Sequence, residues 1–263
     1  MNDGMDDVDG PGAARSARDR FAPGPHGPQD AQCAFVLHSY PFKETSLVVE
    51  LLTRSHGRIP VVARGARRPK SALRGVLLAF QPLLVSWSGK GELHTLLRAE
   101  WHGPYQPLKG LALICGFYLN ELLLKLLARH DAHERLFDTY GQTLAALVAP
   151  GDPGAILRTF EKNLLRELGY AVLLERDVAS GHPIAAERRY TYVLERGPVC
   201  ATDDAGANGV ELLGQTLIDM QADVYSSAMT QQQSKVLMRT LINHYLGDQV
   251  LHTRQLLRDL QEL

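Results

Sequence analysis

A change of hydrophobic period near residue 105 constrains the fold of this chain more than any other feature. Between Cys33 and Tyr105 the apolar residues form five short runs separated by turn residues, whereas from Leu108 onward they recur at three- and four-residue spacings. Short runs bounded by turns are typical of strands, and the wider spacing is typical of amphipathic helices. A chain of 263 residues is long enough for two domains. The sequence therefore predicts an α+β protein whose strands and helices lie in separate domains.

The first domain is expected over residues 31–106 as an OB-fold, a five-stranded β-barrel. Its five strand-like runs read CAFVLHSY, SLVVELLT, RIPVVARG, PLLVSWSG and ELHTLLRAEW. Their lengths and turn spacing suit a small barrel, and the β-branched Val48 and Val49 favour strand over helix in the second run. The segment Ser88-Gly89-Lys90-Gly91 lacks the GxxxxGK[ST] pattern of a phosphate-binding loop, so we interpret it as a hairpin turn.

The second domain is expected over residues 107–263 and should be helical. Four segments carry the helical spacing: LALICGFYLNELLLKLLA, HERLFDTYGQTLAALV, PGAILRTFEKNLLRELG and SKVLMRTLINHYL. Pro153 is placed to start the third helix and Gly169 to end it. Around Tyr190 to Leu194, followed by Gly197, a small β-hairpin is expected within an insert near residues 172–204.

Composition adds limits on location and chemistry. Residues 1–30 are rich in Gly, Pro, Asp and Ala and lack periodicity, so a disordered N-terminal extension without an apolar signal region is expected. The longest apolar stretch is interrupted by Asn120, Glu121 and Lys125, which argues against a membrane span. We therefore expect a cytoplasmic protein. The three cysteines lie far apart, and we expect all of them to be reduced thiols: Cys33, Cys115 and Cys200.

The barrel region is basic although the whole chain has a formal net charge of −1. Between Cys33 and Tyr105 there are ten Lys and Arg residues against four Glu and no Asp. Five of these cations fall in the glycine-containing stretch ARGARRPKSALRG, where they would suit phosphate contacts. The candidate DNA-binding residues are Arg64, Arg67, Arg68, Lys70 and Arg74. A solvated charged loop is the alternative reading of the same run.

Four aromatic side chains of the same region could stack on single-stranded bases. They are Tyr40, Phe42, Phe80 and Trp87. At strand-like positions most of them are better explained as core residues, so none is selected as a binding residue.

Beyond these patterns, the amino-acid sequence resembles one known family. AFVLHSYPFKETSLVVELLT and GRIPVVARGARRPKSALRGVLLAFQPLLVSW closely resemble the opening barrel of the bacterial RecO family of recombination mediators. Similar matches run through YLNELLLKLL, HERLFDTYGQTLAAL, RTFEKNLLRELGY and RTLINHYLGDQVLHTRQLLRDL, so that the resemblance covers nearly everything after the N-terminal extension.

The resemblance implies a function in DNA repair of the RecF-type pathway, without catalytic turnover or a cofactor. Members of the family bind single- and double-stranded DNA and anneal complementary strands coated with the single-stranded DNA-binding protein SSB. They contact the acidic C-terminal tail of SSB and act with RecR to help load RecA. A nucleoid-associated location would follow, and the basic barrel agrees with such a role.

Three cations of RTFEKNLLRELGY are candidates for contact with the SSB tail. Arg158, Lys162 and Arg166 fall at i, i+4 and i+8 and therefore drift along one face of a helix. A basic ridge beside an apolar groove would pair with carboxylates while burying an aromatic residue. Arg158 is the leading candidate. The alternative is a solvated helix face with local pairs such as Arg158 with Glu161.

Some RecO-like proteins carry two CxxC pairs, a spacing specific for structural zinc. The matching places here read Asp177-x-x-Ser180 and Cys200-x-x-Asp203, which leaves one thiol. Asp177, Cys200 and Asp203 with His182 would make only a weak mixed set, so we expect no structural metal and an insert held by ordinary packing.

Two other functions are weighed against DNA repair. His130 and Asp131 superficially resemble the His-Asp pair of metal-dependent phosphohydrolases, but Asp131 is expected to cap the following helix. The second alternative is a different OB-fold nucleic-acid protein, RNA-binding or translation-associated. A basic barrel surface alone does not show whether the ligand is DNA or RNA.

Overall fold

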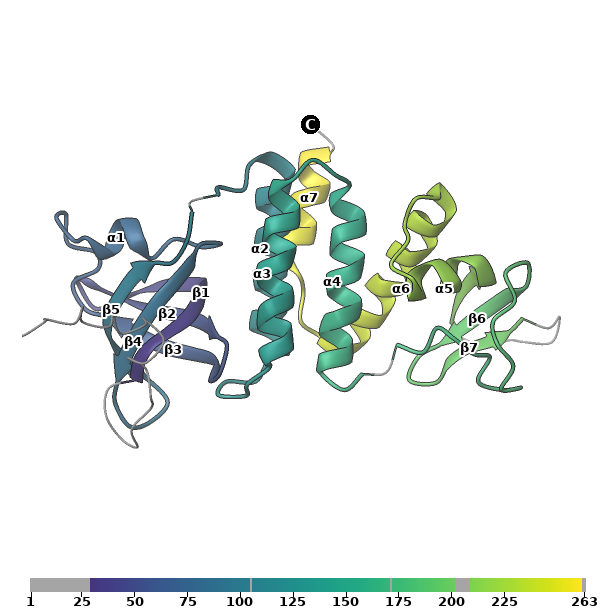
Figure 1. The fold of residues 1–263 in the computed structure, drawn as a ribbon, viewed down its shortest axis with the longest axis horizontal. Helices are drawn as coiled ribbons and strands as arrows, with labels where there is room; N and C mark the ends of the chain where they lie inside the picture. Colours follow the sequence, from purple (N-terminus) through teal and green to yellow (C-terminus); the bar gives the residue numbers. More distant parts are fainter. Residues whose placement is uncertain (1–28, 105, 171, 202–208, 262–263) are drawn as a thin grey trace, which may run out of the picture.

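The computed structural model describes residues 29–104, 106–170, 172–201 and 209–261. Figure 1 shows a β-barrel at one end, a group of helices in the middle and a small sheet at the other end. Most of the expected extension, residues 1–28, lies outside the described residues. The first strand already begins at Gln29, four residues before the first predicted run.

The predicted five-stranded barrel is confirmed. The strands are β1 (Gln29–Phe42), β2 (Ser46–Thr53), β3 (Gly57–Ala63), β4 (Pro82–Ser88) and β5 (His94–Trp101), and they close in the order β1-β2-β3-β5-β4. The pairs are antiparallel except β3 with β5. A single helical turn that the sequence did not predict, α1 (Leu73–Val76), lies between β3 and β4.

Alternation along the strands separates the two faces of the barrel. Inward side chains such as Val49, Leu51 and Leu83 fill the barrel and are fully buried. Some side chains of β1, among them Phe35 and Leu37, belong to the core that the barrel shares with the helical domain. Phe35 lies 5.2 Å from Phe137 and 5.1 Å from Tyr140, measured between ring centroids.

Among the described residues, the helical half contains the four predicted helices and two more. The predicted ones are α2 (Gly110–Leu126), α3 (Glu134–Val148), α4 (Pro153–Glu167) and α6 (Ala228–Leu246). Pro153 is the first residue of α4, Asp152 accepts a hydrogen bond from the Gly154 amide, and Gly169 follows the helix with φ +81°. The additional helices are α5 (Gly214–Gln221) and α7 (His252–Gln261). None of the helices within the described ranges is long and apolar enough to span a membrane.

The expected hairpin is present but belongs to a larger sheet. Strands β6 (Arg189–Val193) and β7 (Gly197–Cys200) form it, and β8 (Val210–Leu213) pairs with the other edge of β6. The four-residue β8 has no periodicity long enough to be recognised in the sequence, and its place is set by pairing with β6.

A buried carboxylate joins the barrel to the helices. Glu50 on β2 is 2% exposed, accepts a hydrogen bond from Arg129 and pairs with the Nε atom of Arg58 at 3.7 Å. Arg58 also donates to the carbonyl of Leu124 at the end of α2. Two guanidinium groups therefore compensate one buried negative charge at the domain boundary.

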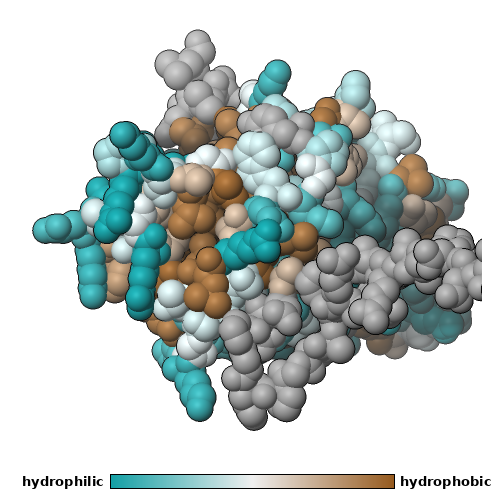
Figure 2. All heavy atoms as spheres, turned by 60° about the vertical axis from the view of Figure 1, so that its left-hand side comes forward, coloured by the Kyte–Doolittle hydropathy of each residue, from teal (hydrophilic) through white to brown (hydrophobic). Residues whose placement is uncertain are grey.

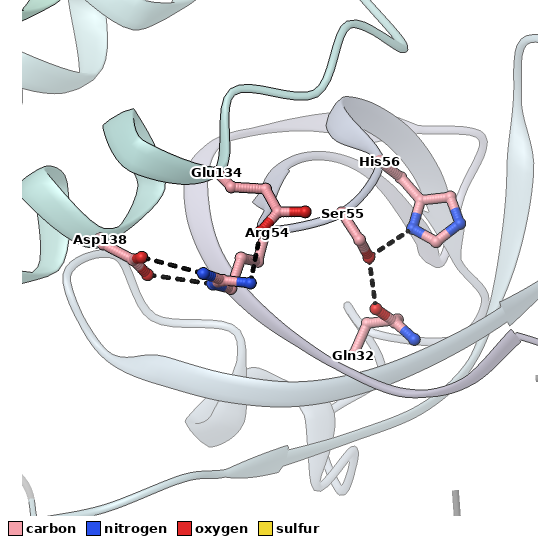
Figure 3. A network of polar contacts seen from close by, with 6 residues as sticks. All are labelled: Gln32, Arg54, Ser55, His56, Glu134 and Asp138. Carbon is pink, nitrogen blue, oxygen red and sulfur yellow. Dashed lines mark hydrogen bonds and ion pairs between the residues drawn. The ribbon is translucent and has the colours of Figure 1, made fainter. Parts of the chain in front are cut away.

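A second, exposed network lies between the β2–β3 turn and α3 (Figure 3). Arg54 donates to both carboxylate oxygens of Asp138 at 3.1 Å and to Glu134 at 2.6 Å, while the Ser55 hydroxyl donates to Gln32 at 2.7 Å. Because Arg54, Glu134 and Asp138 are about half exposed, these ion pairs add little stability. Because the two carboxylates of α3 neutralise Arg54, this arginine adds no free positive charge to the barrel surface.

Candidate nucleic-acid interface and partner-binding pocket

The basic loop, residues 64–74, lies at the end of the barrel where β3 finishes and α1 begins. Its cations Arg64, Arg67, Arg68, Lys70 and Arg74 are all exposed. Figure 2, which brings the barrel forward, shows long hydrophilic side chains projecting around hydrophobic ones.

The loop holds most of the uncompensated positive charge of the barrel. Arg54 pairs with α3, Arg58 pairs with Glu50, and Arg98 pairs with Glu100 at 2.9 Å. Within the described part of the chain, the five loop cations have no carboxylate partner. Their charge is therefore available to an anionic ligand.

Arg67 differs from its neighbours because it anchors the loop. Its backbone N–H donates to the Thr45 carbonyl at 2.8 Å, and its Nη1 atom donates to the carbonyls of Lys43 and Glu44 at 3.3 Å. These bonds hold the loop against the β1–β2 turn and bring Lys43, a cation that the sequence analysis did not select, to the same surface.

The four aromatic candidates divide as the sequence suggested. Phe80 and Trp87 are 8% and 3% exposed and belong to the core, and Phe42 is partly buried with Lys43 5.5 Å from its ring centroid. Tyr40 is 44% exposed and packs edge-on to His38.

A cationic pocket of about 660 Å³ opens between the helices. Apolar side chains form part of its wall, among them Leu111, Cys115 and Leu157, and four cations line it. These are Arg158 of α4, Lys235 and Arg239 of α6, and Arg254 of α7. Asp152 is the acidic residue of the lining. Lys235 and Arg239 are exposed and stand one turn apart, at i and i+4.

Arg158 reaches this pocket from a buried polar cluster. Its guanidinium donates to Glu161 at 2.6 Å, Glu161 is 0% exposed and also accepts from the Tyr118 hydroxyl, and Arg254 donates to that hydroxyl at 2.9 Å. Burial and the negative charge of Glu161 raise the pKa of Tyr118 far above its usual range, so the hydroxyl stays protonated. The local pair of Arg158 with Glu161 is therefore present but buried, not solvated.

The other two cations predicted on α4, Lys162 and Arg166, lie outside this pocket. Lys162 is buried, donates to the Met220 carbonyl at 2.6 Å and pairs with Asp223 at 2.8 Å. Arg166 is exposed and donates to Asn163. Neither residue lines the pocket. The sequence analysis did not select Lys235 and Arg239 of the pocket lining. Their i, i+4 spacing could have indicated a basic helix face, but nothing in the sequence shows that α6 lies beside α4.

The insert places Asp177 and Cys200 next to each other. Asp177 accepts hydrogen bonds from the amides of Ala179 and Ser180 through one oxygen, and from the Cys200 amide through the other. Burial opposes ionisation, but these bonds outweigh it and hold the pKa of Asp177 below its usual range. Asp203 lies outside the described residues, and among those described no cluster of three or more His, Cys, Asp or Glu side chains suits a metal ion.

The expected cap by Asp131 is wrong. The N-cap of α3 is His133, with no side-chain capping bond, and Asp131 instead pairs with His133 at 3.4 Å. The His130 amide donates to the carbonyl of Arg58 on β3, so the segment before α3 is held against the barrel. His130 and Asp131 belong to no metal-binding cluster of the described residues.

A closed five-stranded barrel with an exposed basic loop, followed by a helical unit, defines an OB-fold-like two-part protein. Comparison with known protein families identifies the family of this chain. The profile for the N terminal of recombination protein O matches residues 31–105, and the profile for its C terminal matches residues 108–255. The chain belongs to the RecO family of DNA repair proteins.

Curated relatives are similar in sequence to nearly the whole of this chain. The DNA repair protein RecO of Nitrosospira multiformis is 56% identical over 235 residues, which cover 89% of this chain and 97% of the relative. The protein of the same name from Aromatoleum aromaticum has the same identity and coverage. That from Paraburkholderia xenovorans is 55% identical over 232 residues, or 88% of this chain and 77% of the relative.

Proposed function

We propose that this protein is a non-enzymatic recombination mediator that binds single- and double-stranded DNA and anneals complementary strands coated with SSB. With RecR it helps load RecA, at the nucleoid. The basic loop on the barrel is the DNA-binding surface, and the cationic pocket of the helical domain takes the acidic tail of SSB.

The observation that carries the DNA-binding role is the uncompensated charge of the basic loop. Five exposed cations without carboxylate partners in the described residues stand on a barrel whose other arginines are paired. Phosphate neutralisation by such cations releases counterions and supplies most of the affinity for either form of DNA. Arg67 positions the loop, so Arg64, Lys70 and Arg74 are the residues whose charge can be removed with least disturbance.

Strand annealing tests this role directly. Complementary oligonucleotides coated with SSB are mixed with the protein without nucleotide or metal, and wild type is compared with the combined Arg64→Ala, Lys70→Ala and Arg74→Ala variant. We expect annealing by wild type that weakens with salt, and loss of annealing in the variant. The slope of log affinity for duplex DNA against log salt concentration should fall by about 2 to 3, because three phosphate contacts are removed.

A variant with the same charge loss elsewhere is the control. Arg135, Arg188 and Arg196 are exposed on the helical domain and the insert, so their combined replacement by Ala should leave annealing unchanged. If both triple variants lose equal activity, the effect is one of net charge and not of the loop. A well-folded wild type that binds matched RNA as tightly as DNA and does not anneal would favour a different OB-fold nucleic-acid protein.

The pocket has the chemistry that an acidic peptide ending in an aromatic residue requires. Its apolar wall can bury a ring, while Lys235 and Arg239 are exposed at the rim and can pair with carboxylates. Arg158 contributes less free charge than its position suggests, because Glu161 already compensates it. Lys162 and Arg166 stay predictions that the pocket geometry does not favour.

Binding of a fluorescent peptide with the acidic C-terminal sequence of SSB tests the pocket. The combined Lys235→Glu and Arg239→Glu variant should weaken binding by about tenfold or more, since two attractive pairs become repulsive. Arg166→Glu, on the same helix as Arg158 but outside the pocket, should stay within about twofold. A larger loss in Arg166→Glu than in the α6 variant would place the tail along the exposed face of α4.

A further inference from the structure

A carboxylate of α2 holds the start of the C-terminal helix α7. The side chain of Glu121 accepts hydrogen bonds from the backbone amides of His252 and Thr253 at 2.8 and 2.9 Å, and from the Thr253 hydroxyl at 2.6 Å. The first amides of a helix have no partner within the helix, so a carboxylate from another element can cap them. Burial opposes ionisation of Glu121, but these hydrogen bonds and the charge of Lys125 outweigh it and hold its pKa below the usual range. Glu121 is therefore an anion when it caps α7.

Lys125, one turn further along α2, holds the same junction. Its ammonium group lies 3.6 Å from Glu121 and donates to the carbonyl of Val250, just before α7, at 2.7 Å. Figure 1 shows α7 beside α2. Leu251 is buried at the junction, whereas the described side chains of α7 itself, residues 252–256, are exposed or partly exposed. In the described residues, the contacts that hold the start of α7 are therefore mainly polar.

The first turn of α7 carries Arg254 into the wall of the cationic pocket. The Arg254 guanidinium donates to the Tyr118 hydroxyl at 2.9 Å and to Asn243 of α6 at 2.7 Å, and it lies 5.4 Å from the centroid of the Tyr118 ring. Both hydrogen-bond acceptors are neutral, and no carboxylate of the described residues forms an ion pair with Arg254. Glu161 compensates the charge of Arg158, whereas the charge of Arg254 is available to a ligand in the pocket.

We propose that Glu121 is a positioning residue for the cationic pocket: by capping α7 it holds Arg254 where a carboxylate of the bound peptide can pair with it. The inference rests on the proposed binding of an acidic tail and adds the contact that completes its site. Lys235 and Arg239 belong to one helix, α6, whereas Arg254 depends on the contact between α2 and α7. Without the charge of Glu121 the first turn of α7 loses its cap, and Arg254 loses its fixed place beside Tyr118.

Binding of the fluorescent acidic peptide with the C-terminal sequence of SSB by a Glu121→Gln variant tests this role. Gln has the size of Glu but no charge, and its amide nitrogen cannot accept the hydrogen bonds that the second carboxylate oxygen accepts. We expect the affinity for the peptide to fall by about three- to tenfold, because an ion pair with the peptide depends on where Arg254 is held. Asp248→Asn is the control. It removes the same charge from an exposed position between α6 and α7 and should leave the affinity within about twofold of wild type.

A double-mutant cycle separates positioning from a general effect on stability. Arg254→Ala should weaken peptide binding by about tenfold, since it removes the pairing group itself. If Glu121 acts through Arg254, adding Glu121→Gln to Arg254→Ala should cause a further loss of about twofold at most. Losses that multiply in the double variant, or wild-type affinity in Glu121→Gln alone, would overturn the inference.

Hydrogen exchange shows whether α7 is released. In Glu121→Gln the amides at the start of α7 should exchange faster, while those of α4 and α6 should keep their wild-type rates. Unchanged exchange at α7, or faster exchange throughout the helical domain, would contradict a local positioning role.

Failure of this inference is distinguishable from failure of the proposed function. If wild type binds the peptide and the combined Lys235→Glu and Arg239→Glu variant does not, while Glu121→Gln binds like wild type, the pocket takes the tail without needing the cap on α7. If folded wild type binds no acidic peptide, the proposed role of the pocket fails and the inference fails with it.

Discussion

Gly57 shows how one residue can limit the approach of two domains. It begins β3 with φ +65°, and a Cβ atom at this position would lie 1.9 Å from the carbonyl oxygen of Asp131. Gly57→Ala should therefore reduce the free energy of unfolding by about 2 kcal/mol or more, from backbone strain and from displacement of the segment before α3. Urea denaturation measures the change. Gly151→Ala is the control, because a Cβ atom there meets nothing within 4 Å, and its free energy of unfolding should stay within about 0.5 kcal/mol of wild type. Equal effects of the two substitutions would show that the segment before α3 moves aside at little cost.

The insert is an element held by one carboxylate. Asp177→Asn replaces the oxygen that accepts the Cys200 amide by an amide group that cannot, which should cost about 1 to 2 kcal/mol at pH 7. Because the folded pKa of Asp177 is below the ordinary 3.8, wild type has this stability above that value and loses it as pH falls through the folded pKa. Urea unfolding at pH 7 and at lower pH, with hydrogen exchange over the insert, should show a difference that shrinks with acid. Glu187→Gln, an exposed carboxylate of the same segment, should show none; a pH-independent difference would mean that Asp177 acts through packing alone.

At the scale of the whole molecule, the barrel and the helices should unfold together. One core runs from Phe35 and Leu37 of the barrel through the helices to Tyr192 of the insert, and the buried Glu50 of β2 pairs with Arg129 in the segment after α2. Both tryptophans lie in the barrel, whereas most helical residues lie outside it, so fluorescence and circular dichroism at 222 nm report different parts. The two urea curves should coincide. Glu50→Ala, which leaves the largely buried guanidinium of Arg58 uncompensated, should cost about 3 kcal/mol. Separate transitions in wild type would show that the boundary is weaker than its packing suggests.

The candidate site could be predicted in part. The basic loop followed from local charge density in ARGARRPKSALRG, but the sequence could not separate Arg67, which anchors the loop, from Arg64 and Arg74, which face solvent. On α4, helical spacing grouped Arg158 with Lys162, although Lys162 is paired with Asp223 from the segment after α5. Partners distant in the sequence decide which cations are free, and a local pattern carries no information about them.

The sequence by itself determined the strands, the main helices and the division between them, because hydrophobic period and turn residues act over a few neighbours. Only the tertiary structure decided the start of α3, the third strand of the insert and the pocket between α4 and α6. It also decided that Trp101, unlike Trp87, stands outside the core. Each of these depends on which segments meet in space, and burial and pairing between distant segments are fixed by packing of the whole chain.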